Sequence, residues 1–164
     1  MIRGRGVESA ASAQLFRLPT RYAFPMKETL TPGLTHRMTY PVTAERTVPH
    51  LLPEAAEFAS MPNVLATGYL VGVIEWACMQ AIAPHLGENE ISLGIHVDLS
   101  HRAPTVPGST VSVDVELTEI DRRSLTFRIT ATDDHGVIST GTHRRGVVDR
   151  EKFISRLPSP TREI

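Results

Sequence analysis

The chain has one cysteine in 164 residues, few aromatic side chains and almost no net charge. The single cysteine, Cys78, excludes a disulfide framework and any zinc site built on clustered cysteines, and its apolar surroundings predict a buried thiol. A formal net charge of -1 gives no electrostatic basis for nucleic acid or an anionic membrane as the main partner. No two of the seven histidines have the HxH or HxxH spacing of a local metal motif.

Charge is also scarce within one long segment. Residues 58–87 contain a single formally charged side chain, Glu75. The apolar residues there do not keep to a narrow stripe, which predicts a helix over about residues 64–84 that is buried on most sides. The segment is too short to span a bilayer comfortably, so we expect no transmembrane helix. Because an isolated buried charge is costly, the Glu75 carboxylate must be paired, protonated or functional.

The first 25 residues differ from the rest of the chain in composition. They contain four arginines against one acidic residue, Glu8, and lack a contiguous secretory apolar core. We expect residues 1–25 to be an over-extended start or a disordered leader, with a targeting segment or an ordered arm as the alternatives. The predicted domain covers residues 26–153 and is followed by a tail at 154–164. We expect the protein to be cytoplasmic.

Strand patterns dominate the second half of the chain. Apolar and polar residues alternate through residues 91–99, 111–117 and 125–131, and short turn-like sequences favour antiparallel hairpins. Further strands are expected at 35–42 and 137–148. We therefore predict an α+β fold, the hot-dog architecture, in which an antiparallel sheet of about five strands wraps around one long central helix. One sheet covers only part of so apolar a helix, so we expect a homodimer.

The period-two pattern also distinguishes two histidines. His101 has the parity of the apolar residues in 91–99, so without a bulge it faces the helix where the strand ends, whereas His96 faces away. This favours His101 as the chemical histidine. The alternative is a histidine whose hydrogen bonds are satisfied at the end of a strand.

Thr67 lies where the long helix begins. As an N-cap, its hydroxyl would satisfy the first helical amides. In a functional role, it would lie with those amides beside a developing oxyanion or a bound carboxylate. Thr67 and Glu75 are eight residues apart, which separates them by roughly 80° around the helix axis and roughly 12 Å along it. If both serve one site, that site is extended or is completed by two subunits.

These candidates belong to a set of spaced motifs. The motifs are Ala66-Thr67-Gly68, Glu75-Trp76-Ala77-Cys78, Ser92-Leu93-Gly94, His101 and Gly141-Thr142-His143. Together they closely resemble the fluoroacetyl-CoA thioesterase family of hot-dog proteins, over about residues 26–153. The resemblance does not extend to residues 1–25 or to the tail at 158–164.

What the resemblance implies is hydrolysis of an acyl-CoA thioester by a catalytic triad of Thr67, Glu75 and His101. It also implies that the backbone N–H of Gly94 lies near the thioester carbonyl and that Arg145 contacts the substrate. The family needs no metal and no redox cofactor, and the sequence offers neither site. The implied partner is therefore the acyl-CoA substrate, with no role for nucleic acid or a membrane.

Selectivity is where the sequence departs from the family. The fluoroacetyl-specific enzyme has a phenylalanine gate before its helix, and the matching residue here is Met61, a flexible thioether in place of a rigid ring. A second aromatic of the same segment is retained as Phe58. We expect a small or medium acyl-CoA substrate, with fluoroacetyl-CoA among the candidates.

Three alternatives stay open at this point. A non-catalytic acyl-CoA sensor or carrier could share the fold, although neither end of the chain is long or patterned enough for a DNA-binding segment. A hydratase of the same fold typically uses an Asp/His pair on a different motif, which the sequence does not contain. The cluster at residues 143–145 is interpreted either as a contact to CoA phosphates or as an exposed basic strand.

Overall fold

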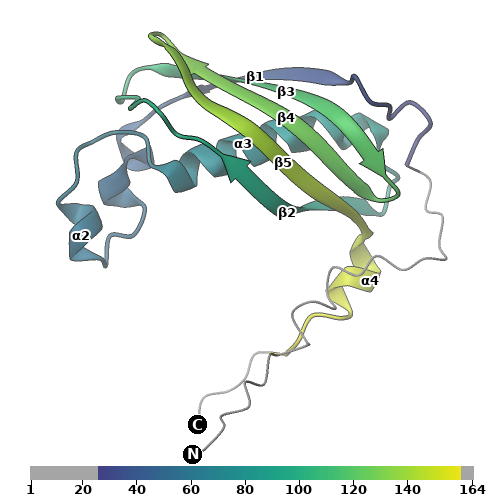
Figure 1. The fold of residues 1–164 in the computed structure, drawn as a ribbon. Helices are drawn as coiled ribbons and strands as arrows, with labels where there is room; N and C mark the ends of the chain where they lie inside the picture. The colour runs from purple at the N-terminus through teal and green to yellow at the C-terminus, as the bar shows by residue number, and fades with distance from the viewer. Residues whose placement is uncertain (1–25, 160–164) are drawn as a thin grey trace, which may run out of the picture.

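The computed structural model describes residues 26–159, so the expected leader at residues 1–25 and residues 160–164 of the expected tail lie outside the described residues. Five antiparallel strands form one sheet in the order β1-β3-β4-β5-β2. The sheet curves over the long helix α3 (Figure 1), which confirms the predicted hot-dog fold.

The strands match the predicted segments closely. They are β1 (Thr35–Pro41), β2 (Glu90–Leu99), β3 (Thr110–Asp121), β4 (Ser124–Asp133) and β5 (Gly136–Asp149). The helices are α2 (Ala56–Ala59), α3 (Thr67–Ile82) and α4 (Arg150–Ile154), with short 3-10 turns at Ala44–Arg46, Val48–His50 and Ala83–His85.

The alternation predicted for β3 and β4 is confirmed. Their apolar residues are buried, and the polar residues between them face the other side of the sheet. The buried set is Val111, Val113, Val115, Leu117, Leu125, Phe127, Ile129 and Ala131. Because one face alone is buried, the alternation sets which side of the sheet packs on α3. A slip of one residue in the register would expose the whole buried set.

The parity predicted for β2 is wrong over its first half. Ser92 is buried, and a Cβ added to Gly94 would meet the carboxylate of Glu75, so these even-numbered residues face the helix. Ile91 and Leu93, which the apolar pattern placed inside, lie on the other face and are half-buried. The strand departs from the apolar pattern because small residues are needed where the helix carries a carboxylate.

A β-bulge at Ile95 then reverses the parity of the strand. The register of β2 against β5 shifts between Gly94 and His96, so Ile95 has no partner in the ladder. Beyond the bulge the odd-numbered residues face inward, and Leu99 packs against the core. Bulges of this kind re-aim side chains beside functional sites. His101 therefore reaches the helix as predicted, but only because the bulge compensates for the inverted first half.

Helix α3 is buried on one face, whereas the sequence predicted burial on most sides. Its buried residues are Leu70, Val73, Ile74, Ala77, Cys78, Ala81 and Ile82. Burial raises the pKa of the Cys78 thiol to about 12, so this group is inert, as expected. On the other side of α3, Trp76 and Met79 are 49% and 45% exposed. Within residues 26–159, none of the helices has the length and apolar character needed to cross a membrane.

A buried ion pair connects the start of β2 to the turn between β3 and β4. Arg123 donates to Glu90 Oε1 at 2.6 Å, and Gly87 N–H donates to Glu90 Oε2 at 2.7 Å. We expect Glu90→Ala to lower the free energy of unfolding by about 3 kcal/mol, because it removes the carboxylate from a guanidinium that is only 11% exposed. Urea unfolding at one fixed protein concentration measures the change.

The matched control for this prediction is an exposed ion pair on the same sheet. Glu116 pairs with Arg128 at 3.0 Å, and the two side chains are 39% and 66% exposed. We expect Glu116→Ala to change the free energy of unfolding by less than about 1 kcal/mol. Equal effects of the two replacements would contradict the stabilising role of burial at Glu90.

Candidate active site

Thr67 and His101 meet at the N-terminal end of α3. Thr67 is the first helical residue, Ala66 occupies the N-cap position, and the side chains at this end make no capping hydrogen bond. The Thr67 hydroxyl is instead hydrogen-bonded to His101 Nδ1 at 2.8 Å. The capping role considered for Thr67 is therefore wrong. The alternative of a His101 whose hydrogen bonds are satisfied at the strand end is wrong too, because Nδ1 is bonded to Thr67 and Nε2 is buried without a partner among the described residues.

The electrostatics of this pair suit proton transfer. Burial lowers the pKa of His101 below its ordinary value, although an interaction with the Ala103 backbone partly opposes the shift. The imidazole is therefore neutral near pH 7 and can accept a proton. The pair opens onto a depression of about 320 Å³ whose lining includes Val64, Arg102 and Pro104. Thr67 and His101 both line this depression, and His101 Nε2 is buried without a hydrogen-bond partner within residues 26–159.

Glu75 lies two turns further along α3 and faces β2. Its side chain is 35% exposed, and its two carboxylate oxygens lie 3.7 Å from Arg145 and from His143. A Cβ at Gly94 would overlap Glu75 Oε1 and would lie 3.2 Å from His143 Cε1. Only glycine at this position lets the carboxylate approach the backbone of the strand. The structure thus brings Glu75, Gly94 and Arg145 together.

Arg145 is buried beneath the carboxylate with an exposure of only 2%. Its Nε donates to Ser92 Oγ at 2.9 Å, and its NH2 group donates to the Ser92 carbonyl at 2.8 Å. Burial lowers the pKa of Arg145, and Glu75 opposes that shift, so the guanidinium keeps its charge as arginine does in proteins. The interpretation of residues 143–145 as an exposed basic strand is wrong, because only Arg144 points outward.

Ser92 is a residue of this site to which the sequence reasoning assigned no role. The alternation of β2 placed it on the outer face, together with Gly94. The signal that was present is the Ser92-Leu93-Gly94 motif itself, since small polar residues on a strand next to a buried arginine supply acceptors without filling space. Recognising it required the partner strand, because Ser92 and Arg145 are 53 positions apart in sequence.

One chain therefore contains two separate groups of predicted site residues. The Thr67–His101 pair lies at the start of α3, and Glu75 lies eight residues later, which corresponds to roughly 12 Å along the helix axis. Phe58 and Met61 belong to the segment around α2, which projects beyond the end of the sheet (Figure 1). Phe58 is half-buried there, and Met61 is 50% exposed.

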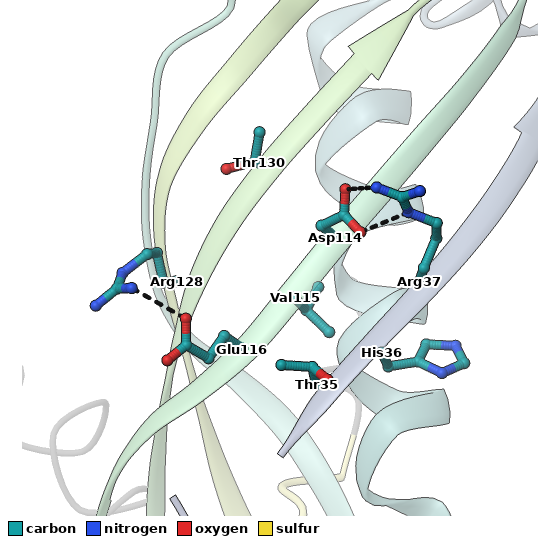
Figure 2. Close-up of a pocket in the computed structure, with 8 residues that line it drawn as sticks. All are labelled: Thr35, His36, Arg37, Asp114, Val115, Glu116, Arg128 and Thr130. Carbon is teal, nitrogen blue, oxygen red and sulfur yellow. Dashed lines mark hydrogen bonds and ion pairs between the residues drawn. The ribbon is translucent and has the colours of Figure 1, made fainter. Parts of the chain in front are cut away.

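The outer face of the sheet carries a different group of charges. A depression of about 400 Å³ lies over β1, β3 and β4. Figure 2 shows that Arg37 pairs there with Asp114 and that Arg128 pairs with Glu116. Each charge is matched by a partner on the neighbouring strand. Exposed pairs of this kind contribute little energy and leave no unpaired reactive group. This depression is therefore a weaker candidate than the groups on α3.

Comparison with known proteins identifies the family. The profile of the family described as fluoroacetyl-CoA-specific thioesterase matches residues 42–151. The fluoroacetyl-CoA thioesterase of Streptantibioticus cattleyicolor is 42% identical over 136 residues, which are 83% of this chain and 98% of that protein.

Solved structures agree with the sequence comparison. A phenylalanine-to-alanine variant of the fluoroacetyl-CoA-specific thioesterase, in complex with fluoroacetate and CoA, aligns with a TM-score of 0.74 at 44% identity and covers 76% of this chain and 99% of that one. A hot-dog-like protein from Thermanaerovibrio acidaminovorans is 22% identical, aligns with a TM-score of 0.68 and covers 79% and 91% of the two chains, which shows the shared fold alone. With more than half of its length matched in both sequence and structure, this chain belongs to the fluoroacetyl-CoA-specific thioesterase family and is a thioester hydrolase.

Proposed function

We propose that this protein hydrolyses acyl-CoA thioesters that carry a small or medium acyl group, with Thr67, Glu75 and His101 as catalytic residues. The observation that carries the proposal is the Glu75 carboxylate, which lies against the glycine backbone of β2 above a buried guanidinium. A carboxylate in such a polar enclosure can act as a base or as a nucleophile. The family relationship supports an acyl-CoA thioester as the bond that this protein cleaves.

In the proposed reaction, the thioester carbonyl lies against the Gly94 N–H, which stabilises the negative charge of the tetrahedral state. Glu75 either activates water or attacks the carbonyl to give a mixed anhydride. His101 acts as the base for water or as the acid for the CoA thiolate, and Thr67 orients its partner through the hydrogen bond to Nδ1. Arg145 lies beneath the Glu75 carboxylate, with its NH1 group 3.7 Å from Oε2, and orients it toward the substrate.

We also propose that the working site needs two copies of the chain. The Thr67–His101 pair and Glu75 are too far apart on one straight helix to bond directly. The exposed Trp76 and Met79 on α3 are the kind of apolar surface that a second copy covers, and β2 is an edge strand of the sheet. A homodimer that brings the Thr67–His101 pair of one copy to Glu75 of the other joins the two groups.

A cytoplasmic location of the protein stays a prediction.

The direct test is thiol release from a panel of acyl-CoAs that includes acetyl-CoA, fluoroacetyl-CoA and longer chains. Hydrolysis of the short members with release of free CoA is the expected result. Binding of every acyl-CoA without release of thiol would favour the sensor or carrier alternative. Conversion of an enoyl-CoA without loss of the thioester would favour the hydratase.

The residue at position 61 is expected to set selectivity between fluoroacetyl-CoA and acetyl-CoA. We expect Met61→Phe to raise the ratio of their kcat/KM values by about tenfold, because a rigid ring discriminates small acyl groups better than a flexible thioether does. Met61→Leu is the matched control, since it keeps a flexible apolar side chain, and it should leave the ratio near that of the wild type. Similar ratios for the two variants would exclude this position as the gate.

Gly94 is expected to tolerate no side chain. We expect Gly94→Ala to lower kcat by about 100-fold, since the added Cβ displaces the Glu75 carboxylate and alters the backbone donor. Gly146→Ala is the control on the neighbouring strand, where the new Cβ makes an ordinary 3.4 Å contact with Ile95. Steady-state thiol release compares them, and an active Gly94→Ala enzyme would contradict the role of this glycine.

A further inference from the structure

His143 is a buried histidine on β5 to which the mechanism above assigns no step. It is completely inaccessible to solvent. Its Nδ1 lies 2.9 Å from the carbonyl oxygen of His96, and its Nε2 lies 3.1 Å from the NH1 group of Arg145. Glu75 Oε1 is 3.7 Å from the same Nε2. Both ring nitrogens are thus committed to partners on two different strands.

The chemistry of those partners determines where the imidazole carries its proton. Arginine has only donors, so the nitrogen that faces Arg145 must be the acceptor and carries no proton. A carbonyl oxygen only accepts, so the nitrogen that faces His96 must carry the proton. Both requirements are met by one state alone, a neutral ring with its proton on Nδ1. The contact with Glu75 is therefore not an ion pair, because the facing nitrogen has no proton to donate.

The network also spans the β-bulge of β2. Arg145 is held by Ser92 before the bulge, and His143 is held by the His96 carbonyl just after it. The shift in register at Ile95 lies between these two anchors. The imidazole is therefore the link that connects the guanidinium to the far side of the bulge.

We propose that His143 is a positioning residue: a neutral imidazole with its proton on Nδ1, which ties the Arg145 guanidinium to the bulge of β2 and so holds the cation that lies beneath Glu75. The inference rests on the proposed function, since its purpose is to orient the carboxylate that performs hydrolysis. The titratable and charged groups that face the ring are Glu75 from α3, His96 from β2 and Arg145 on its own strand. Burial and Arg145 lower the pKa of His143, and Glu75 opposes them, which is in keeping with a neutral ring.

The first test uses the wild-type protein and needs no turnover. Long-range ¹H–¹⁵N NMR spectra of histidine-labelled protein distinguish the two neutral tautomers and the imidazolium. We expect one histidine to show the Nδ1–H pattern unchanged across neutral pH, and its signals to be missing from a His143→Gln variant. A proton on Nε2, or on both nitrogens, would overturn the inference.

The second test separates hydrogen bonding from packing. His143→Phe keeps a ring of similar size and loses both hydrogen bonds, whereas His143→Gln keeps a carbonyl that can accept from Arg145. We expect the phenylalanine variant to lose about ten- to hundredfold in kcat with a small change in KM, and the glutamine variant to recover part of that loss. A packing role predicts the opposite order. Ser139→Ala, which removes a buried hydroxyl of β5 without a hydrogen-bond partner among the described residues, is the control and should keep wild-type kcat.

The two proposals fail in distinguishable ways. A wild-type protein that releases no thiol from any member of the panel defeats the proposed function. An active enzyme whose His143 carries its proton on Nε2, or whose phenylalanine variant keeps wild-type kcat, defeats the positioning role alone.

Discussion

Replacement of Glu75 by glutamine is expected to lower kcat for thiol release by about 10²- to 10⁴-fold. The amide has nearly the same shape as the carboxylate and can still lie against Gly94 and Arg145. It has no charge to activate water and no oxygen nucleophilic enough to attack a thioester. Acyl-CoA binding should therefore persist while the chemical step is lost. Steady-state kinetics with the preferred acyl-CoA, together with a binding isotherm for the variant, measure the two effects separately.

Glu88→Gln is the matched control, because Glu88 is an exposed carboxylate in the loop that precedes β2. It should leave kcat and KM unchanged. A Glu75→Gln enzyme that turns over at the wild-type rate would remove Glu75 from the mechanism. In the active wild type, single turnover in heavy-oxygen water tests the covalent route, since label in the Glu75 side chain would indicate a mixed anhydride and exclude direct attack by water as the sole route.

Subunit mixing is expected to restore activity to two variants that are each inactive. In the proposed homodimer, His101→Ala and Glu75→Gln each inactivate both sites of their own dimer. If every site takes Thr67 and His101 from one copy and Glu75 from the other, a mixed dimer contains one site with all native residues. Random exchange of equal amounts makes half of the dimers mixed, so about a quarter of the wild-type activity should return in a symmetric dimer.

The converse experiment provides the control. A chain that carries both replacements is mixed with the wild type, and each mixed dimer then has one defect in each of its two shared sites. These dimers should be inactive. If all three residues of a site come from one chain, the outcomes are exchanged: the two single variants fail to complement, and the dimers of double variant with wild type keep half of their sites. Thiol release after subunit exchange at fixed total protein decides between the two arrangements.

Local patterns in the sequence were sufficient for much of the fold. The alternation in β3 and β4 predicts their buried faces correctly, because side-chain direction in a strand follows sequence position with a period of two. The apolar segment around Glu75 predicts the central helix for a similar reason. The parity of His101 predicts the correct face, but the premise of a strand without a bulge is wrong. A single inserted residue reverses all later side chains, and no local pattern marks where it occurs.

The surroundings of the carboxylate depended on contacts that are distant in sequence. Ser92 and Arg145 are 53 positions apart, and His143 and His96 are 47 positions apart, yet the pairing of β2 with β5 makes each pair neighbours. The burial of Arg145 follows from that pairing, which is why an exposed basic strand was an open interpretation from sequence.

The element order, the buried faces of β3 and β4 and the single carboxylate in an apolar helix can be predicted from the sequence, because each of these depends on neighbours along the chain. The bulge at Ile95, the network beneath Glu75 and the hydrogen bond between Thr67 and His101 emerge in the folded chain alone. These features depend on strand register and helix geometry, which arise when the sheet closes over α3. The residue types therefore indicate the chemistry of the site, whereas the packing of the sheet on α3 sets its geometry.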